Sequence, residues 1–263
     1  MRFSRTVRFL PRFRALRTFV VLASALVFML GGAIWLRTTH AENAPASVQQ
    51  TSDSPYHPTP LARTQRPTAL FVGDDFTAGY GGIGRNAYPR MVCDVLRMNC
   101  NVDAQAGTGL IDDGRDFSDI SVRLIDRLPA DQRLYTADVV IVDAGRNDLE
   151  VAPEAYGKAL EQFLLRVTKI WSDAKIVVIA PSYLSSNPDS NYDARISVIS
   201  NVVKSFHGIL IDPLAERWYE GADVSTLLLF NNVHPNQTGH EFIAEKLEQS
   251  LRNRGIGQEG LKN

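Results

Sequence analysis

The chain has 263 residues, of which 44% are hydrophobic and 22% are charged, enough for one globular domain with some additional length. This composition excludes collagen, long disordered chains and multi-span membrane proteins. The formal net charge of -1 hides an uneven distribution, because residues 1–37 contain seven arginines and no acidic residue, which leaves residues 38–263 with 21 basic and 29 acidic side chains. The acidic remainder argues against a nucleic-acid partner.

An apolar segment follows the basic residues 1–18. Residues 19–36 (FVVLASALVFMLGGAIWL) carry no charged side chain, and their 18 positions approach the length that crosses a bilayer as a helix. Because six of the seven arginines lie before this segment, the positive-inside rule places the N-terminus in the cytoplasm. We therefore expect a single-pass membrane anchor and an extracytoplasmic main domain. A cleaved signal peptide, giving a secreted protein, is the alternative, since Thr39-His40-Ala41 ends in a small residue as a cleavage site does.

The rest of the chain divides into a linker and one domain. Residues 37–67 are rich in Pro, Ser, Thr and Gln without an apolar period, which predicts a disordered linker. Over residues 68–256, short apolar runs alternate with amphipathic stretches, the pattern of a parallel sheet covered by helices. Residues 257–263 form a C-terminal tail.

The elements of this domain follow from the alternation. Five apolar runs are predicted strands: Ala69–Gly73, Val102–Ala106, Val139–Ala144, Ile176–Ala180 and Gly208–Ile211. Five amphipathic stretches are predicted helices: Pro89–Arg97, a stretch around Ile120–Leu128, Pro153–Trp171, Asp193–Phe206 and Pro235–Arg252. Pro89, Pro153 and Pro235 are each expected in a first helical turn, where a missing N–H is tolerated. We predict a three-layer α/β/α sandwich with a five-stranded, mainly parallel sheet.

The chain has two cysteines, Cys93 and Cys100. Outside the cytoplasm, a pair this close in sequence can form one local disulfide. Two buried thiols at the end of a helix are the alternative, and the sequence leaves both open. No Cys/His cluster indicates a zinc site, and we expect neither a metal ion nor a cofactor.

Four polar, glycine-containing segments stand at predicted strand ends or before the last helix. In an open α/β sheet the ligand lies beyond the carboxyl ends of the strands, so these segments are the candidates for chemistry. They are Gly73–Gly81 (GDDFTAGYG), Ala106–Gly109 (AGTG), Gly145–Asp148 (GRND) and Asn231–His240 (NNVHPNQTGH).

The order and spacing of these segments resemble the SGNH (GDSL) hydrolases, a family of esterases, lipases and carbohydrate acetyl esterases. The family has a nucleophilic Ser in the first segment, a Gly in the second, an Asn in the third and an Asp three residues before a His in the last. Gly107, Asn147 and His234 match this pattern. Two positions of the triad depart from it: Asp75 stands at the nucleophile position and Asn231 at the position of the triad acid.

The resemblance implies a role for each position. In the family, His takes the proton of the Ser nucleophile, and the acid orients the His. The backbone N–H at the Asp75 position, the N–H of Gly107 and the amide of Asn147 would form the oxyanion hole. Asp75 is an anion at neutral pH, and its attack on an ester would give an anhydride. Its carboxylate would also lie beside the donors meant for the transition state.

Three functions follow as hypotheses. The first is a catalytically impaired SGNH-type domain, displayed outside the membrane, that binds an acylated glycan or lipid in the ancestral cleft. The second is an active hydrolase in which Asp75 is the nucleophile and His234 activates water, with Asp212 as a candidate acidic partner for the His. The third is a membrane-tethered scaffold in which the cleft has no role. The sequence identifies no protein partner.

Overall fold

The computed structural model describes residues 66–82, 86–182, 184–185 and 190–257. The predicted basic segment, the apolar segment 19–36, nearly all of the linker and all but the first residue of the tail lie outside these ranges. Within them, every helix is too short or too polar to cross a membrane.

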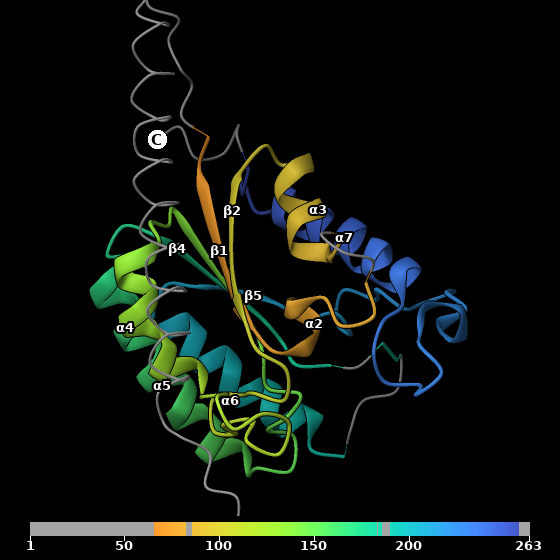
Figure 1. Cartoon of the computed structure of the whole chain (residues 1–263), viewed down its shortest axis with the longest axis horizontal. Coiled ribbons are helices and arrows are strands. Elements are labelled where there is room, and N and C mark those ends of the chain that lie inside the picture. The colour runs from red at the N-terminus through yellow and green to blue at the C-terminus, as the bar shows by residue number, and fades with distance from the viewer. Residues whose placement is uncertain (1–65, 83–85, 183, 186–189, 258–263) are drawn as a thin grey trace, which may run out of the picture. The chain divides into compact units, whose positions relative to one another are not determined.

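A sheet of five parallel strands forms the centre of the domain (Figure 1), which confirms the predicted fold class. The strands are β1 (Thr68–Gly73), β2 (Asn99–Ala104), β3 (Val139–Asp143), β4 (Lys175–Ile179) and β5 (Ile209–Ile211). Their spatial order is β2-β1-β3-β4-β5, and all four pairings are parallel. β1 from Ala69 to Val72 and β3 from Val139 to Val142 are continuous apolar runs, because helices cover both faces of the sheet.

Helices cover both faces of the sheet and complete the three expected layers (Figure 1). They are α2 (Asp75–Ala78), α3 (Tyr88–Val95), α4 (Leu124–Leu134), α5 (Pro153–Ile170), α6 (Tyr192–Ser205) and α7 (Gln237–Arg252), with a 3-10 turn η1 at Val224–Leu227. One core lies between the sheet and α3 and α7, and includes Phe71 and Leu247. The other lies under α4, α5 and α6, and includes Leu160 and Phe163.

Several predicted boundaries were wrong, and three elements show the reasons. β2 begins at Asn99 and ends at Ala104, because an edge strand accepts polar residues that a central strand would not. The helix expected around Ile120–Leu128 is α4, which begins at Leu124; Ile120 precedes it in a loop and is 87% exposed. α7 begins at Gln237 rather than Pro235, because Asn236 is its N-cap and accepts a hydrogen bond from the Gly239 N–H.

Cys93 in α3 and Cys100 in β2 form a disulfide, with their Cα atoms 5.7 Å apart. The bond ties the helix to the edge strand that follows it. Cys100 is the second residue of β2, so the link lies near the amino end of the strand, whereas the segments predicted to carry chemistry follow the carboxyl ends.

This disulfide is expected to stabilise the fold by restricting the unfolded chain. For two cysteines seven residues apart, the loop-closure relation gives about 2.5 kcal/mol. Cys93→Ala/Cys100→Ala should lose about that much unfolding free energy in urea, and the unsubstituted protein treated with dithiothreitol should lose a similar amount. Unchanged stability in both samples would contradict the prediction.

Candidate active site

The sheet topology brings the four segments together. The chain leaves β1 through α3, on one face, to reach β2, and leaves β2 through α4, on the other face, to reach β3. The crossover side therefore changes at β1, and such a switch point is where open α/β sheets bind ligands. The first and third segments follow β1 and β3, the two neighbouring central strands.

Asp75 is the first residue of α2 and is almost fully buried, at 6% exposure. Its Oδ1 accepts a hydrogen bond from the Gly107 backbone N–H at 3.1 Å, and its Oδ2 accepts one from the Asn147 Nδ2 at 3.1 Å. These are the two donors that the resemblance assigned to an oxyanion hole besides the backbone of Asp75 itself. The carboxylate of Asp75 thus occupies them.

Local structure holds both donors in place. Gly107 has a φ of 73°, a left-handed conformation that favours glycine, and the Phe117 ring lies where a β-carbon at this position would be. Asn147 Nδ2 also donates to the Thr108 carbonyl at 3.0 Å, which fixes the orientation of the amide. Asp148 accepts from the backbone N–H groups of Leu110, Ile111 and Asp112, so the last residue of the third segment anchors the loop after the second.

His234 lies beside Asp75 on the more open side of the site. The distance from its Nε2 to Asp75 Oδ1 is 3.6 Å, an ion-pair distance longer than a good hydrogen bond, and its side chain is 20% exposed. The Tyr80 ring centroid is 4.5 Å from that of His234, and the Phe76 centroid is 5.9 Å away. Two aromatic rings therefore hold the imidazole next to the carboxylate.

Asn231 is the partner of His234 on the side away from Asp75. Its Nδ2 is 2.8 Å from His234 Nδ1, and its Oδ1 accepts from the backbone N–H groups of Val233 and His234 at 3.1 Å each. Asp212, considered above as an acidic partner, instead accepts hydrogen bonds from the Tyr192 hydroxyl and from the backbone of Leu214 and Ala215. Among the described residues, no group of three or more His, Cys, Asp or Glu side chains could hold a metal ion.

Arg146 is a residue of the site that sequence reasoning missed. Its buried guanidinium forms ion pairs with Asp74 at 3.2 Å and with Asp143 at 2.8 Å, lies over the Phe76 ring and donates to the Ser182 carbonyl. Tyr88 donates to the other oxygen of Asp143 at 2.6 Å. A signal existed: Asp143 ends β3 and Asp74 follows β1, and two buried carboxylates on adjacent strands require a nearby cation.

Charge and burial shift the protonation of this network. Burial raises the pKa of Asp74 to about 7, against the lowering effect of Arg146. The carboxylates of Asp143 and Asp75 add to the increase. Burial and the Asp143 carboxylate together raise the pKa of Tyr88. Asp74 therefore keeps its proton to a higher pH than an exposed aspartate would.

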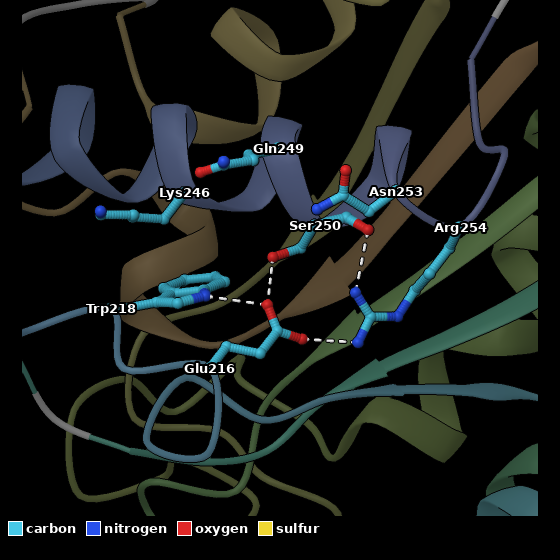
Figure 2. A pocket seen from close by; sticks show the side chains of 7 residues that line it. All are labelled: Glu216, Trp218, Lys246, Gln249, Ser250, Asn253 and Arg254. Atoms are coloured by element: carbon cyan, nitrogen blue, oxygen red, sulfur yellow. Dashed lines mark hydrogen bonds and ion pairs between the residues drawn. The ribbon is translucent and has the colours of Figure 1, made fainter.

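A separate pocket of about 320 Å³ lies between the segment after β5 and the C-terminal half of α7 (Figure 2). Its walls are formed by Glu216, Trp218, Lys246, Gln249, Ser250, Asn253 and Arg254. The Glu216 carboxylate accepts from the Trp218 indole N–H at 3.1 Å, from the Ser250 hydroxyl and from Arg254 at 2.6 Å. These bonds join the segment after β5 to the C-terminal end of α7. They use both oxygens of the Glu216 carboxylate, which is therefore a structural link rather than a ligand-binding group.

The raised pKa of Asp74 predicts how stability depends on pH. Because the group binds its proton more tightly in the folded state, its contribution to stability is complete below pH 4 and is lost as pH rises through about 7. Asp74→Asn, which does not titrate, should give a flatter curve of unfolding free energy against pH between 4.5 and 8. Urea unfolding measures both curves, and Asp126→Asn, at an exposed ion pair, is the control. Parallel curves for Asp74→Asn and the unsubstituted protein would contradict the prediction.

Comparison with known proteins identifies the family to which the chain belongs. The GDSL-like Lipase/Acylhydrolase family matches residues 71–242. A GDSL lipase of Mycobacterium tuberculosis, Rv0518, is 28% identical over 206 residues, which cover 73% of this chain and 84% of that protein. The structure of a lipase/acylhydrolase from Enterococcus faecalis superposes with a TM-score of 0.55 at 18% identity, covering 71% of this chain and 96% of that one. A family two carbohydrate esterase from Clostridium thermocellum, solved in complex with cellohexaose, gives a TM-score of 0.58 at 19% identity and covers 76% and 66%. The chain belongs to the GDSL-like lipase/acylhydrolase family, the SGNH hydrolases that its four segments resemble.

Proposed function

We propose that this protein is a catalytically impaired family member that binds an acylated glycan or lipid in the ancestral cleft. One observation carries the proposal: the carboxylate of Asp75 accepts the hydrogen bonds of Gly107 and Asn147, the donors that would stabilise an oxyanion. A substrate carbonyl would have to displace this carboxylate to reach them. The negative charge would also oppose the charge that develops on the carbonyl oxygen.

The side chain at position 75 cannot replace the family's serine. A carboxylate that attacks an ester forms an anhydride. The anhydride is higher in free energy than the ester, so its formation is unfavourable. The alternative in which Asp75 attacks a different electrophile has less support, because the hydrogen bonds from Gly107 and Asn147 stabilise the carboxylate and so lower its nucleophilicity. In serine proteases, loss of the nucleophile costs on the order of 10⁶ in kcat, and Asp→Asn at the third triad position costs about 10⁴.

The surroundings of Asp75 support ligand binding. Tyr80, packed against His234, and Phe117, packed against Gly107, are 53% and 69% exposed. Phe230, four residues before His234, is 95% exposed. Exposed aromatic rings offer apolar surface for contact with a ligand. The named relatives include a lipase and an esterase in complex with an oligosaccharide, which agree with both ligand classes.

The proposal includes a location. The uncharged residues 19–36 and the arginines before them would anchor the protein in a membrane with its N-terminus in the cytoplasm. The linker of residues 37–67 would then connect the anchor to the domain on the outer side. A domain in this location could reach acylated glycans or lipids of a cell envelope.

Impairment predicts that the purified full-length chain has no His234-dependent esterase activity. Hydrolysis of p-nitrophenyl acetate and butyrate should proceed at one rate for the unsubstituted protein and for His234→Ala. His207→Ala changes an exposed histidine outside the site and controls for the substitution itself. Robust turnover by the unsubstituted protein that His234→Ala abolishes would overturn the proposal.

Removal of the carboxylate should create a binding site for an external one. In Asp75→Ala, the Gly107 and Asn147 donors lose their acceptor, and acetate can take its place. Acetate at ten times its Kd should then stabilise the variant by about 1.4 kcal/mol, with a corresponding increase in Tm, and should leave the unsubstituted protein unchanged. Sodium chloride at equal ionic strength is the control. An equal response of both proteins to acetate would show that Asp75 does not occupy the donors.

A further inference from the structure

The amide of Asn231 has a defined orientation. Its Oδ1 accepts from two backbone N–H groups, those of Val233 and His234, each at 3.1 Å. A flipped amide would set its NH₂ group against these two donors. The NH₂ group must therefore face His234, where Nδ2 lies 2.8 Å from Nδ1.

This orientation decides which nitrogen of His234 carries the proton. The Asn231 NH₂ group can only donate, so His234 Nδ1 must accept and has no hydrogen of its own. In a neutral imidazole the proton is then on Nε2, the nitrogen that faces Asp75 Oδ1 at 3.6 Å. A doubly protonated ring would set the Nδ1–H against the amide hydrogens of Asn231.

We propose that Asn231 is a positioning residue that holds His234 with its Nε2–H facing Asp75, so that the two departures from the family pattern act as one coupled change. In a Ser-His-Asp triad the negative charge lies behind the His, and the nitrogen that faces the nucleophile is a free base. Here the charge lies in front of the His, and the nitrogen that faces it carries hydrogen. This inference rests on the proposed loss of the serine mechanism and adds that restoring one residue does not restore the mechanism.

The proton balance shows why. A serine at position 75 must pass its hydroxyl proton to a lone pair on His234 Nε2 as its oxygen attacks. With Asn231 in place, Nε2 has no free lone pair. Moving this proton to Nδ1 would break the hydrogen bond from Asn231. It would also place the Nδ1–H of His234 against the NH₂ group of Asn231, so that two donors would face each other. An aspartate at position 231 removes the obstacle, because its carboxylate accepts the Nδ1–H and leaves Nε2 free.

Nitrogen NMR of the full-length chain with ¹⁵N-labelled histidine measures the tautomer directly. His234 is assigned among the five histidines by comparison with His234→Ala. In the unsubstituted protein and in Asp75→Ser, Nδ1 should give the shift of an unprotonated nitrogen and Nε2 that of an N–H. In Asp75→Ser/Asn231→Asp the pattern should reverse. An Nδ1–H in the unsubstituted protein, or the same tautomer with and without Asn231→Asp, would overturn the inference.

Ester hydrolysis tests the coupling. Asp75→Ser/Asn231→Asp should hydrolyse p-nitrophenyl acetate about 10²–10⁴ times faster than Asp75→Ser alone, the upper value being the cost of Asp→Asn in a working triad. Asp75→Ser/Asn232→Asp adds the same charge at the neighbouring asparagine and should match Asp75→Ser. Equal rates for Asp75→Ser and the Asn231→Asp double variant would contradict the coupling. Failure of the proposed function is a separate result, since it would appear as turnover in the unsubstituted protein.

Discussion

The buried guanidinium of Arg146 joins the ends of the two central strands. It pairs with Asp74, directly after β1, and with Asp143, at the end of β3, and it also donates to the Ser182 carbonyl beyond β4. Three buried charges are tolerated only because each is paired and hydrogen-bonded. α2 begins immediately after Asp74, so the place of Asp75 in the site depends on this ion-pair network.

That placement brings the Asp75 carboxylate to the N–H of Gly107 and the amide of Asn147. The N–H of Gly107 and the amide of Asn147 are the donors that the resemblance assigns to an oxyanion hole, and a carboxylate accepts from both in this structure. The hydrogen bonds of these two donors are therefore formed without a ligand. A buried polar network with all of its partners present is rigid, and it favours one arrangement of the loops around it.

The sequence predicted the fold better than the details of the site. β1 and β3 were predictable because they are continuous apolar runs, whereas the ends of β2 were not, because an edge strand mixes Asn and Val. The resemblance placed Asp75, Gly107, Asn147, Asn231 and His234 in one site, and the structure brings these residues together. Two features had no sequence pattern of their own. Arg146 matters through contacts between strands far apart in the chain, and the amide orientation of Asn231 depends on where the backbone N–H groups of Val233 and His234 point.

The carboxylate at position 75 also determines how this protein would behave in chemical surveys of hydrolases. Fluorophosphonate probes label serine hydrolases because the activated hydroxyl attacks phosphorus and the adduct is stable. At position 75 a probe would meet an anion whose two oxygens are held by Gly107 and Asn147, and no hydroxyl. A survey based on such labelling would therefore pass over this site, although its fold is that of the enzymes the probes detect.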